Sequence, residues 1–186
     1  MRRFIIISAL FLSGIFCSAQ NSNWSVNAGY LVSQLSASDM GLSFSFDFNG
    51  FTLGVAYDSN TQENSLKFST GVNWDIKTAK AAGLSNTYHY LRIPVHAKYD
   101  FATKGTAKLF VAAGPSVNVG ITNDNVEFDE GDGPKRVFLQ LGLLAGLEFS
   151  GRYIVKIGYD FGVTKFQRVT YTTRCNAFNL GVGYRF

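Results

Sequence analysis

The sequence predicts an all-β protein, an eight-stranded antiparallel, transmembrane up-and-down β-barrel. The composition is the first reason, because 19 Gly, 17 Phe, 9 Tyr and 2 Trp stand beside only 3 Pro. The second is a series of eight runs of roughly ten residues, most of which alternate with the period of two that is typical of strands. The third is that each run separates into a bulky apolar face and a face of glycines and charges.

The N-terminal residues predict a secretory leader. A pair of arginines precedes the apolar stretch 4–16, and small residues at 17–19 offer a cleavage site. This divides the chain into a cleaved signal peptide over 1–19 and a barrel over 20–186. Acylation of Cys17 is a less favoured alternative, because the bulky Phe16 precedes it. The sequence has 17 Lys and Arg residues, two of them in the leader, and 13 Asp and Glu residues. Without the leader the net charge is only +2, so no nucleic-acid partner is expected.

The predicted strands are long enough to cross a bilayer, for which a tilted β-strand needs about 9–11 residues. They cover 24–34, 49–58, 65–75, 88–100, 108–121, 136–149, 152–164 and 175–186. Long gaps at 35–48, 76–87, 122–135 and 165–174 alternate with short ones. Because transmembrane barrels have long external loops and short periplasmic turns, both termini are predicted to be periplasmic. An aromatic girdle is then expected there, made of Trp24, Tyr57, Tyr99, Phe149, Tyr153, Tyr184 and Phe186.

The two faces of the runs predict which side meets lipid. The interior of an eight-stranded barrel is barely wide enough for ordinary side chains, so about 35 large apolar ones cannot fit there. The bulky face is therefore predicted to face lipid, unlike in a soluble lipocalin-like barrel, and the polar face to line the lumen. Confined charges must be paired or hydrated, which favours an ion-pair network that plugs the lumen over a pore with a basic bias. The predicted network consists of Lys67, Arg92, His96, Lys98, Glu148, Lys156, Asp160 and Arg185.

The segment before the second run does not fit the simple pattern. Apolar residues occupy even positions over 42–48 and odd positions over 51–57, and Asn49-Gly50, a strong tight-turn signal, lies between them. Either the second strand begins early and bulges at Gly50, or 41–48 forms a separate ninth strand. Eight strands are kept.

Several segments resemble a known family. They are Gly-Phe-Thr-Leu-Gly at 50–54, Tyr-Leu-Arg-Ile-Pro-Val at 90–95, Leu-Phe-Val-Ala-Ala-Gly-Pro at 109–115 and Gly-Val-Gly-Tyr-Arg-Phe at 181–186. With them the chain resembles the outer membrane protein beta-barrel domain or porin family, which includes PorT-like proteins, and more distantly the OmpA transmembrane domain. The resemblance implies localisation in the cell outer membrane. Tyr184 and Phe186 resemble the signal that the barrel assembly machinery recognises.

Catalytic and metal chemistry find little support in the residues. His89 and His96 lie on opposite faces by parity, and a rim set of His89 with Ser85 is the sole candidate for a lipid-modifying site. We expect no enzyme activity, no cofactor and no metal. The acidic residues in 122–135 are expected to form a solvated loop rather than a Ca²⁺ site; they are Asp124, Glu127, Asp129, Glu130 and Asp132.

The expected function is that of a noncatalytic integral outer-membrane protein. It would serve envelope structure, surface interaction or the assembly of a secretion system. A small passive porin and a lipid-modifying enzyme remain the alternatives. The expected partners are outer-membrane lipid and lipopolysaccharide, the barrel assembly machinery and another envelope protein.

Overall fold

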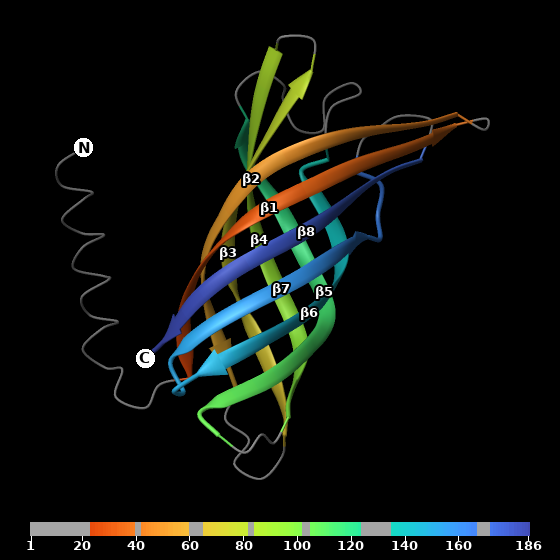
Figure 1. Cartoon of the computed structure of the whole chain (residues 1–186). Helices are drawn as coiled ribbons and strands as arrows, with labels where there is room; N and C mark the ends of the chain where they lie inside the picture. The colour runs from red at the N-terminus through yellow and green to blue at the C-terminus, as the bar shows by residue number, and fades with distance from the viewer. Residues whose placement is uncertain are drawn as a thin grey trace, which may run out of the picture.

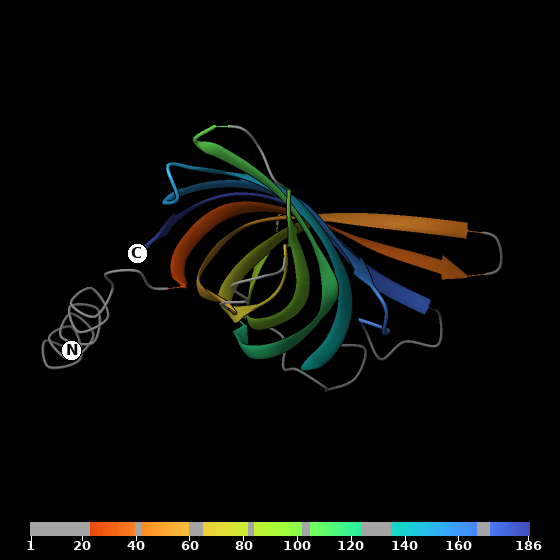
Figure 2. The ribbon, with the colours of Figure 1, turned by 90° about the horizontal axis from the view of Figure 1, so that it is seen from below.

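Eight antiparallel strands close into a barrel in their sequence order, with β8 hydrogen-bonded to β1 (Figures 1 and 2). The computed structural model describes residues 23–39, 42–59, 65–81, 84–101, 105–123, 135–166 and 172–186. The strands are β1 (Trp24–Asp39), β2 (Leu42–Asp58), β3 (Leu66–Ala81), β4 (Leu84–Asp100), β5 (Ala107–Asn123), β6 (Val137–Phe149), β7 (Tyr153–Gly162) and β8 (Thr172–Arg185). The predicted fold class is confirmed.

The two ends of the barrel differ. The start of β1 and the end of β8 lie at one end, here called the terminal end, together with the β2–β3, β4–β5 and β6–β7 connections. The β6–β7 connection is a tight turn in which Ser150 and Gly151 have φ of 52° and 66°. Two successive positive φ values define the turn that matches the twist of paired strands, and Arg152 N donates to Phe149 O at 3.0 Å. The opposite end is called the loop end.

The structure confirms one part of the alternatives predicted for residues 41–50: the second strand begins early, at Leu42, but it does not bulge at Gly50. The β1–β2 register runs without a shift from Trp24↔Tyr57 to Asp39↔Leu42, so there is no bulge, no turn and no ninth strand. The apolar residues change face instead: Phe51 is 63% exposed on the outside, whereas Phe48 is 6% exposed and points into the lumen. The pattern changes because the lumen is apolar at this level, while the backbone continues unbroken.

Two of the predicted long loops are also wrong. Most of 35–48 and 76–87 continues as paired strand, so that β1–β2 and β3–β4 are long hairpins that project at the loop end (Figure 1). These extensions were missed because outward side chains in them, such as that of Asp47, are polar, yet backbone pairing does not require apolar side chains. The acidic residues Asp124 to Asp132 lie outside the described residues.

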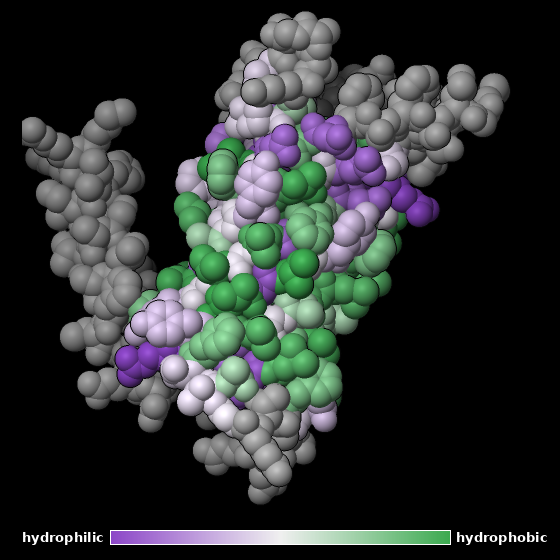
Figure 3. Space-filling model, viewed as in Figure 1, coloured by the Kyte–Doolittle hydropathy of each residue, from purple (hydrophilic) through white to green (hydrophobic). Residues whose placement is uncertain are grey.

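The distribution of side chains between the faces agrees with the prediction. Large apolar residues are exposed around the outside, and the charges predicted for the lumen are not on this surface. Figure 3 shows the apolar band across one face, with hydrophilic side chains toward the loop end. The predicted girdle surrounds the terminal end, where Trp24 packs on Tyr57 and Tyr184 contacts both Tyr153 and Phe186. In the described part of the chain, no helix is long and apolar enough to span a membrane.

Candidate functional site

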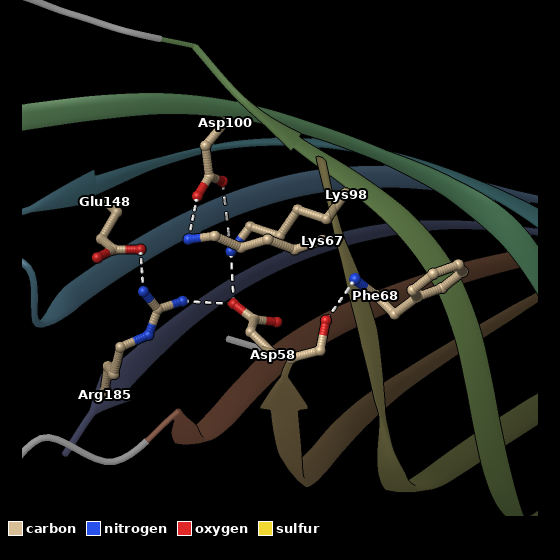
Figure 4. A network of polar contacts seen from close by, with 8 residues as sticks. Asp58, Lys67, Phe68, Lys98, Asp100, Glu148 and Arg185 are labelled. Atoms are coloured by element: carbon tan, nitrogen blue, oxygen red, sulfur yellow. Dashed lines mark hydrogen bonds and ion pairs between the residues drawn. The ribbon is translucent and has the colours of Figure 1, made fainter. Parts of the chain in front are cut away.

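An ion-pair network closes the lumen at the terminal end (Figure 4). Arg185 bridges two strands, with its Nη2 2.5 Å from Asp58 Oδ2 and its Nη1 2.7 Å from Glu148 Oε2. Lys98 Nζ lies 2.6 Å from the same Asp58 oxygen, and Lys67 Nζ lies 2.8 Å from Asp100 Oδ2. We call this set the terminal-end network; it comprises Asp58, Lys67, Lys98, Asp100, Glu148 and Arg185.

These side chains converge because each strand delivers an inward-facing residue at the same level. They come from β2, β3, β4, β6 and β8, and closure of the sheet brings together Asp58 and Arg185, which are 127 residues apart. Lys98 Nζ also lies 4.3 Å from the ring centroid of Phe110, a cation–π contact that supports the ammonium on its other side. Each charge of the network therefore has an opposite charge beside it.

A second ionic cluster lies farther along the lumen. Arg92 is held between two carboxylates, with Nε 2.9 Å from Asp75 Oδ2 and Nη1 2.9 Å from Asp160 Oδ2. Asn179 Nδ2 donates to the same Asp160 oxygen at 3.3 Å. All four side chains are buried. Removing one partner of such a buried pair would leave an uncompensated charge, which makes the cluster a structural crosslink among β3, β4, β7 and β8.

A small polar cavity of about 60 Å³ adjoins this cluster. Its lining includes Lys156 and His96, together with buried Asn27 and Thr52, whose side-chain polar atoms have no hydrogen-bond partner among the described residues. Within those residues no carboxylate lies within 4.0 Å of Lys156. A Cβ on Gly142 would stand 3.0 Å from His96 Nε2, so glycine makes room for the imidazole. The cavity is polar and large enough to hold water.

An aromatic cluster closes the lumen at the loop end. Its members come from several strands and pack edge to face, as Tyr90 and Phe138 do at 5.2 Å and Phe138 and Phe166 at 5.2 Å. Lys77 Nζ lies 5.7 Å from the ring centroids of both Tyr90 and Phe138. We call this cluster the aromatic plug; it comprises Leu35, Phe48, Tyr90, Phe138, Phe166 and Cys175.

The structure distributes six of the eight predicted network residues over two groups and leaves two outside both. Lys67, Lys98, Glu148 and Arg185 join the terminal-end network, and Arg92 and Asp160 form the central cluster. The remaining two, His96 and Lys156, line the cavity without an ion pair among the described residues. The predicted residues thus face one lumen but form no single network.

Three anions of the site were missed by the sequence reasoning. Asp58, Asp75 and Asp100 each occupy the last position of a predicted run, on the same parity as the lumen residues. The parity signal was therefore present in the sequence. The aromatic plug was missed as well, because its residues carry the polar-face parity and an apolar lumen segment was not considered.

The proposed catalytic pair is not assembled. His89 lies on the outer side and stacks on Trp74 at 5.7 Å. Ser85 is four residues away on the same strand, which corresponds to roughly 13 Å along an extended chain. His96 faces the opposite side, into the lumen. In the described portion of the chain, no group of three or more His, Cys, Asp or Glu residues is arranged to hold a metal ion.

Comparison with known families decides where this barrel belongs. The model of the "Outer membrane protein beta-barrel domain" family matches residues 7–186. The chain belongs to this family. Outer-membrane barrel proteins of this family reside in the outer membrane, so the exposed apolar band of this one faces outer-membrane lipid.

Solved structures of outer-membrane proteins share the fold. Neisserial surface protein A is 22% identical, with 89% of this chain and 98% of that chain covered and a TM-score of 0.55. The outer membrane enzyme PagL is 14% identical, with coverages of 84% and 99% and a TM-score of 0.54. The attachment invasion locus protein Ail of Yersinia pestis is 18% identical, with coverages of 88% and 97% and a TM-score of 0.50. These identities show the fold alone, and no curated protein sequence matches the chain.

Proposed function

We propose that this outer-membrane barrel is noncatalytic and non-conducting, and that it acts through the surface it presents outside the cell. The observation that carries the proposal is the filled lumen. Ion pairs occupy its terminal end, the Arg92 cluster its middle and the aromatic plug its loop end. An eight-stranded barrel has little interior space to begin with, so an interior filled at three levels favours a role on the outside.

The two long hairpins support a surface role. On β1 the outward residues change from Val32 to Gln34, and on β2 from Phe51 to Asn49 and Asp47, which marks the upper border of the apolar band. Paired strand continues past this border to Asp39, which corresponds to roughly 20 Å of extended chain. With the termini in the periplasm this part lies outside the cell. Among envelope structure, secretion-system assembly and surface interaction, the hairpins favour surface interaction.

Export and assembly complete the proposal. We infer that the leader over 1–19 directs export, and that Tyr184 and Phe186 form part of the signal read by the barrel assembly machinery. Both aromatic rings lie at the terminal end, and Phe186 N donates to Trp24 O at 3.1 Å, which joins the last residue to the start of β1. We further propose a relation to PorT-like proteins and, more distantly, to the OmpA transmembrane domain, supported by the segments 50–54, 90–95, 109–115 and 181–186 that resemble them. Lipopolysaccharide and another envelope protein are the proposed partners.

Planar-bilayer recording tests the closed lumen. Purified protein, refolded in detergent and inserted into a bilayer, is expected to give no discrete conductance steps. Steps that recur with a constant amplitude would instead favour the passive porin. In parallel, an unchanged lipid profile on deletion of the gene is expected, and loss of a lipid modification on His89→Ala would favour the enzyme.

Shortening the hairpins tests the surface role. The β1–β2 register allows residues 36–39 and 42–45 to be deleted together without changing the pairing below Leu35↔Phe46. A second variant deletes 78–81 and 84–87 from β3–β4, which keeps Lys77↔Tyr88 paired. Both variants should fold and retain heat-modifiable migration. A partner recovered from native outer membranes with the full chain should be lost with at least one of them, and retention by both would contradict a hairpin role.

A further inference from the structure

Three basic side chains form a continuous outward-facing group at the loop end of β6, β7 and β8. They are Lys135, Lys165 and Arg174, here called the basic arc. The side chains of Lys165 and Arg174 are exposed and that of Lys135 is half-buried. The adjacent residues Phe166 and Cys175 face inward, so alternation turns Lys165 and Arg174 away from the lumen. Lys135 precedes β6 and lies beside exposed Arg136.

The arc stands at the upper border of the apolar band. Lys135 is two residues from outward-facing Val137, and Lys165 is two residues from outward-facing Val163. Two residues of strand advance by about 7 Å. The cations are therefore placed at the height where the hydrocarbon of the membrane ends and the polar headgroups begin.

Backbone contacts hold the three positions side by side. Lys135 N donates to Phe166 O at 2.7 Å, and Phe166 N donates to Thr173 O at 2.9 Å. Neighbouring strands in a sheet are about 4.8 Å apart, so the three flexible side chains can reach one ligand. Within the described residues none of the three has a carboxylate within 4.0 Å.

Among the described residues, the border of the apolar band carries opposite charges on two flanks of the barrel. On the described part of β2, at a similar height, the outward charged residue is an acid, Asp47, which accepts a hydrogen bond from Gln34 at 3.4 Å. The border of the apolar band is thus basic over β6–β8 and acidic over β2. Anionic lipids would therefore gather preferentially beside β6–β8.

We propose that the basic arc binds the phosphate groups of phosphorylated lipids that surround the loop end. Arginine offers a fork of donors that matches phosphate oxygens, and lysine adds a mobile point charge. Basic groups at the membrane border recognise anionic headgroups in this way. The inference rests on the external placement of the loop end in the proposed function, and it assigns that flank to lipid. A soluble polyanion would not require the cations to stand on the apolar border.

Lipid A with both phosphates is the probe for this site. The full chain is refolded in detergent, and binding is measured by native mass spectrometry for the wild type and for Lys165→Gln/Arg174→Gln. The matched control is Lys108→Gln/Arg152→Gln, which removes two exposed cations at the terminal end. Each cation near an anionic surface contributes about fivefold in affinity, so the arc variant should bind at least about tenfold more weakly. The control should stay within about twofold of the wild type.

Two further ligands, phosphate-free lipid A and a soluble sulfated oligosaccharide, test which feature of the ligand the site recognises. Lipid A lacking phosphate should bind the wild type no better than diphosphorylated lipid A binds the arc variant. Equal losses in the arc and control variants, or tight binding of phosphate-free lipid A, would overturn the site. Equally tight binding of a soluble sulfated oligosaccharide would replace it with a receptor for soluble polyanions. Intact lipid binding by a chain with the shortened β3–β4 hairpin separates this site from the proposed surface role, because that deletion leaves the pairing of Arg174 with Ser36 in place.

Discussion

The two ends of the lumen are closed by different chemistry. At the terminal end Arg185, Asp58 and their neighbours form ion pairs, with side chains that keep up to a quarter of their surface exposed. At the loop end the aromatic plug is formed by packed side chains, and Tyr90 and Phe138 are almost entirely buried. The first closure depends on charge complementarity and the second on filled volume. The stability of this one narrow interior should therefore depend on charge changes at the terminal end and on volume changes at the loop end.

Position relative to water accounts for the difference. Charged groups near a barrel mouth keep part of their hydration, so that ion pairs form there at a small desolvation cost. Rings packed edge to face exclude water and gain from every contact, so that a missing ring leaves a cavity. Substitutions at the two ends should therefore affect stability in different ways.

The largest effect is expected at the plug. Phe138→Ala should lower the free energy of unfolding by about 3–5 kcal/mol, because it leaves a cavity among rings that cannot collapse onto it. Urea unfolding of protein refolded in lipid vesicles, followed by the fluorescence of the outward-facing Trp24 and Trp74, measures this. Phe138→Leu, which keeps most of the volume, should lose much less. Equal losses in the two variants would argue against a volume-dependent closure.

A smaller loss is expected from the terminal-end network. Arg185→Met should cost about 2–3 kcal/mol, because Glu148 loses its cation while Asp58 keeps Lys98. Adding Glu148→Gln to this variant removes the orphaned charge and should restore part of the loss. Refolding in vitro avoids any effect on cellular assembly. A double variant as unstable as Arg185→Met alone would show that charge pairing is not what Arg185 supplies.

The periphery of the same network should contribute least to stability. Lys67 is the most exposed member, with a quarter of its side-chain surface accessible, and it pairs with Asp100 at the mouth. Lys67→Gln should cost less than about 1 kcal/mol. Raising the salt concentration from about 0.1 to 1 M shortens the Debye length from about 10 to 3 Å and should shrink the difference further. A salt-independent loss of several kcal/mol would place Lys67 in a much drier setting.

Conductance should not change at all in the single variants. If each end closes the lumen by itself, neither Phe138→Ala nor Arg185→Met opens a path in planar-bilayer recording. Steady conductance in only one of them would identify the other end as permeable. Only one end of the lumen would then block the passage of ions.

The sequence could predict the fold to a large extent because alternation is a local property. Each strand separates an apolar from a polar face without reference to its neighbours, so eight strands, their outward faces and the terminal girdle were all predictable. The inward direction of Arg92, Lys98 and Asp160 followed from the same alternation. Of the hairpin extensions only the early start of β2 was indicated, by the alternation over 42–48, because the outward polar residues of the others carry no apolar signal.

The amino-acid sequence therefore encodes the barrel, its two faces and the inward parity of its lumen residues. Which of these residues meet depends on the folded barrel, because closure joins positions as distant as Asp58 and Arg185 and sets their height along the axis. That height separates the ions of the terminal-end network from the Arg92 cluster and allows Phe48 and Phe138 to fill the loop end. The alternation of faces is encoded within each strand, whereas the contacts between lumen side chains depend on the register between strands.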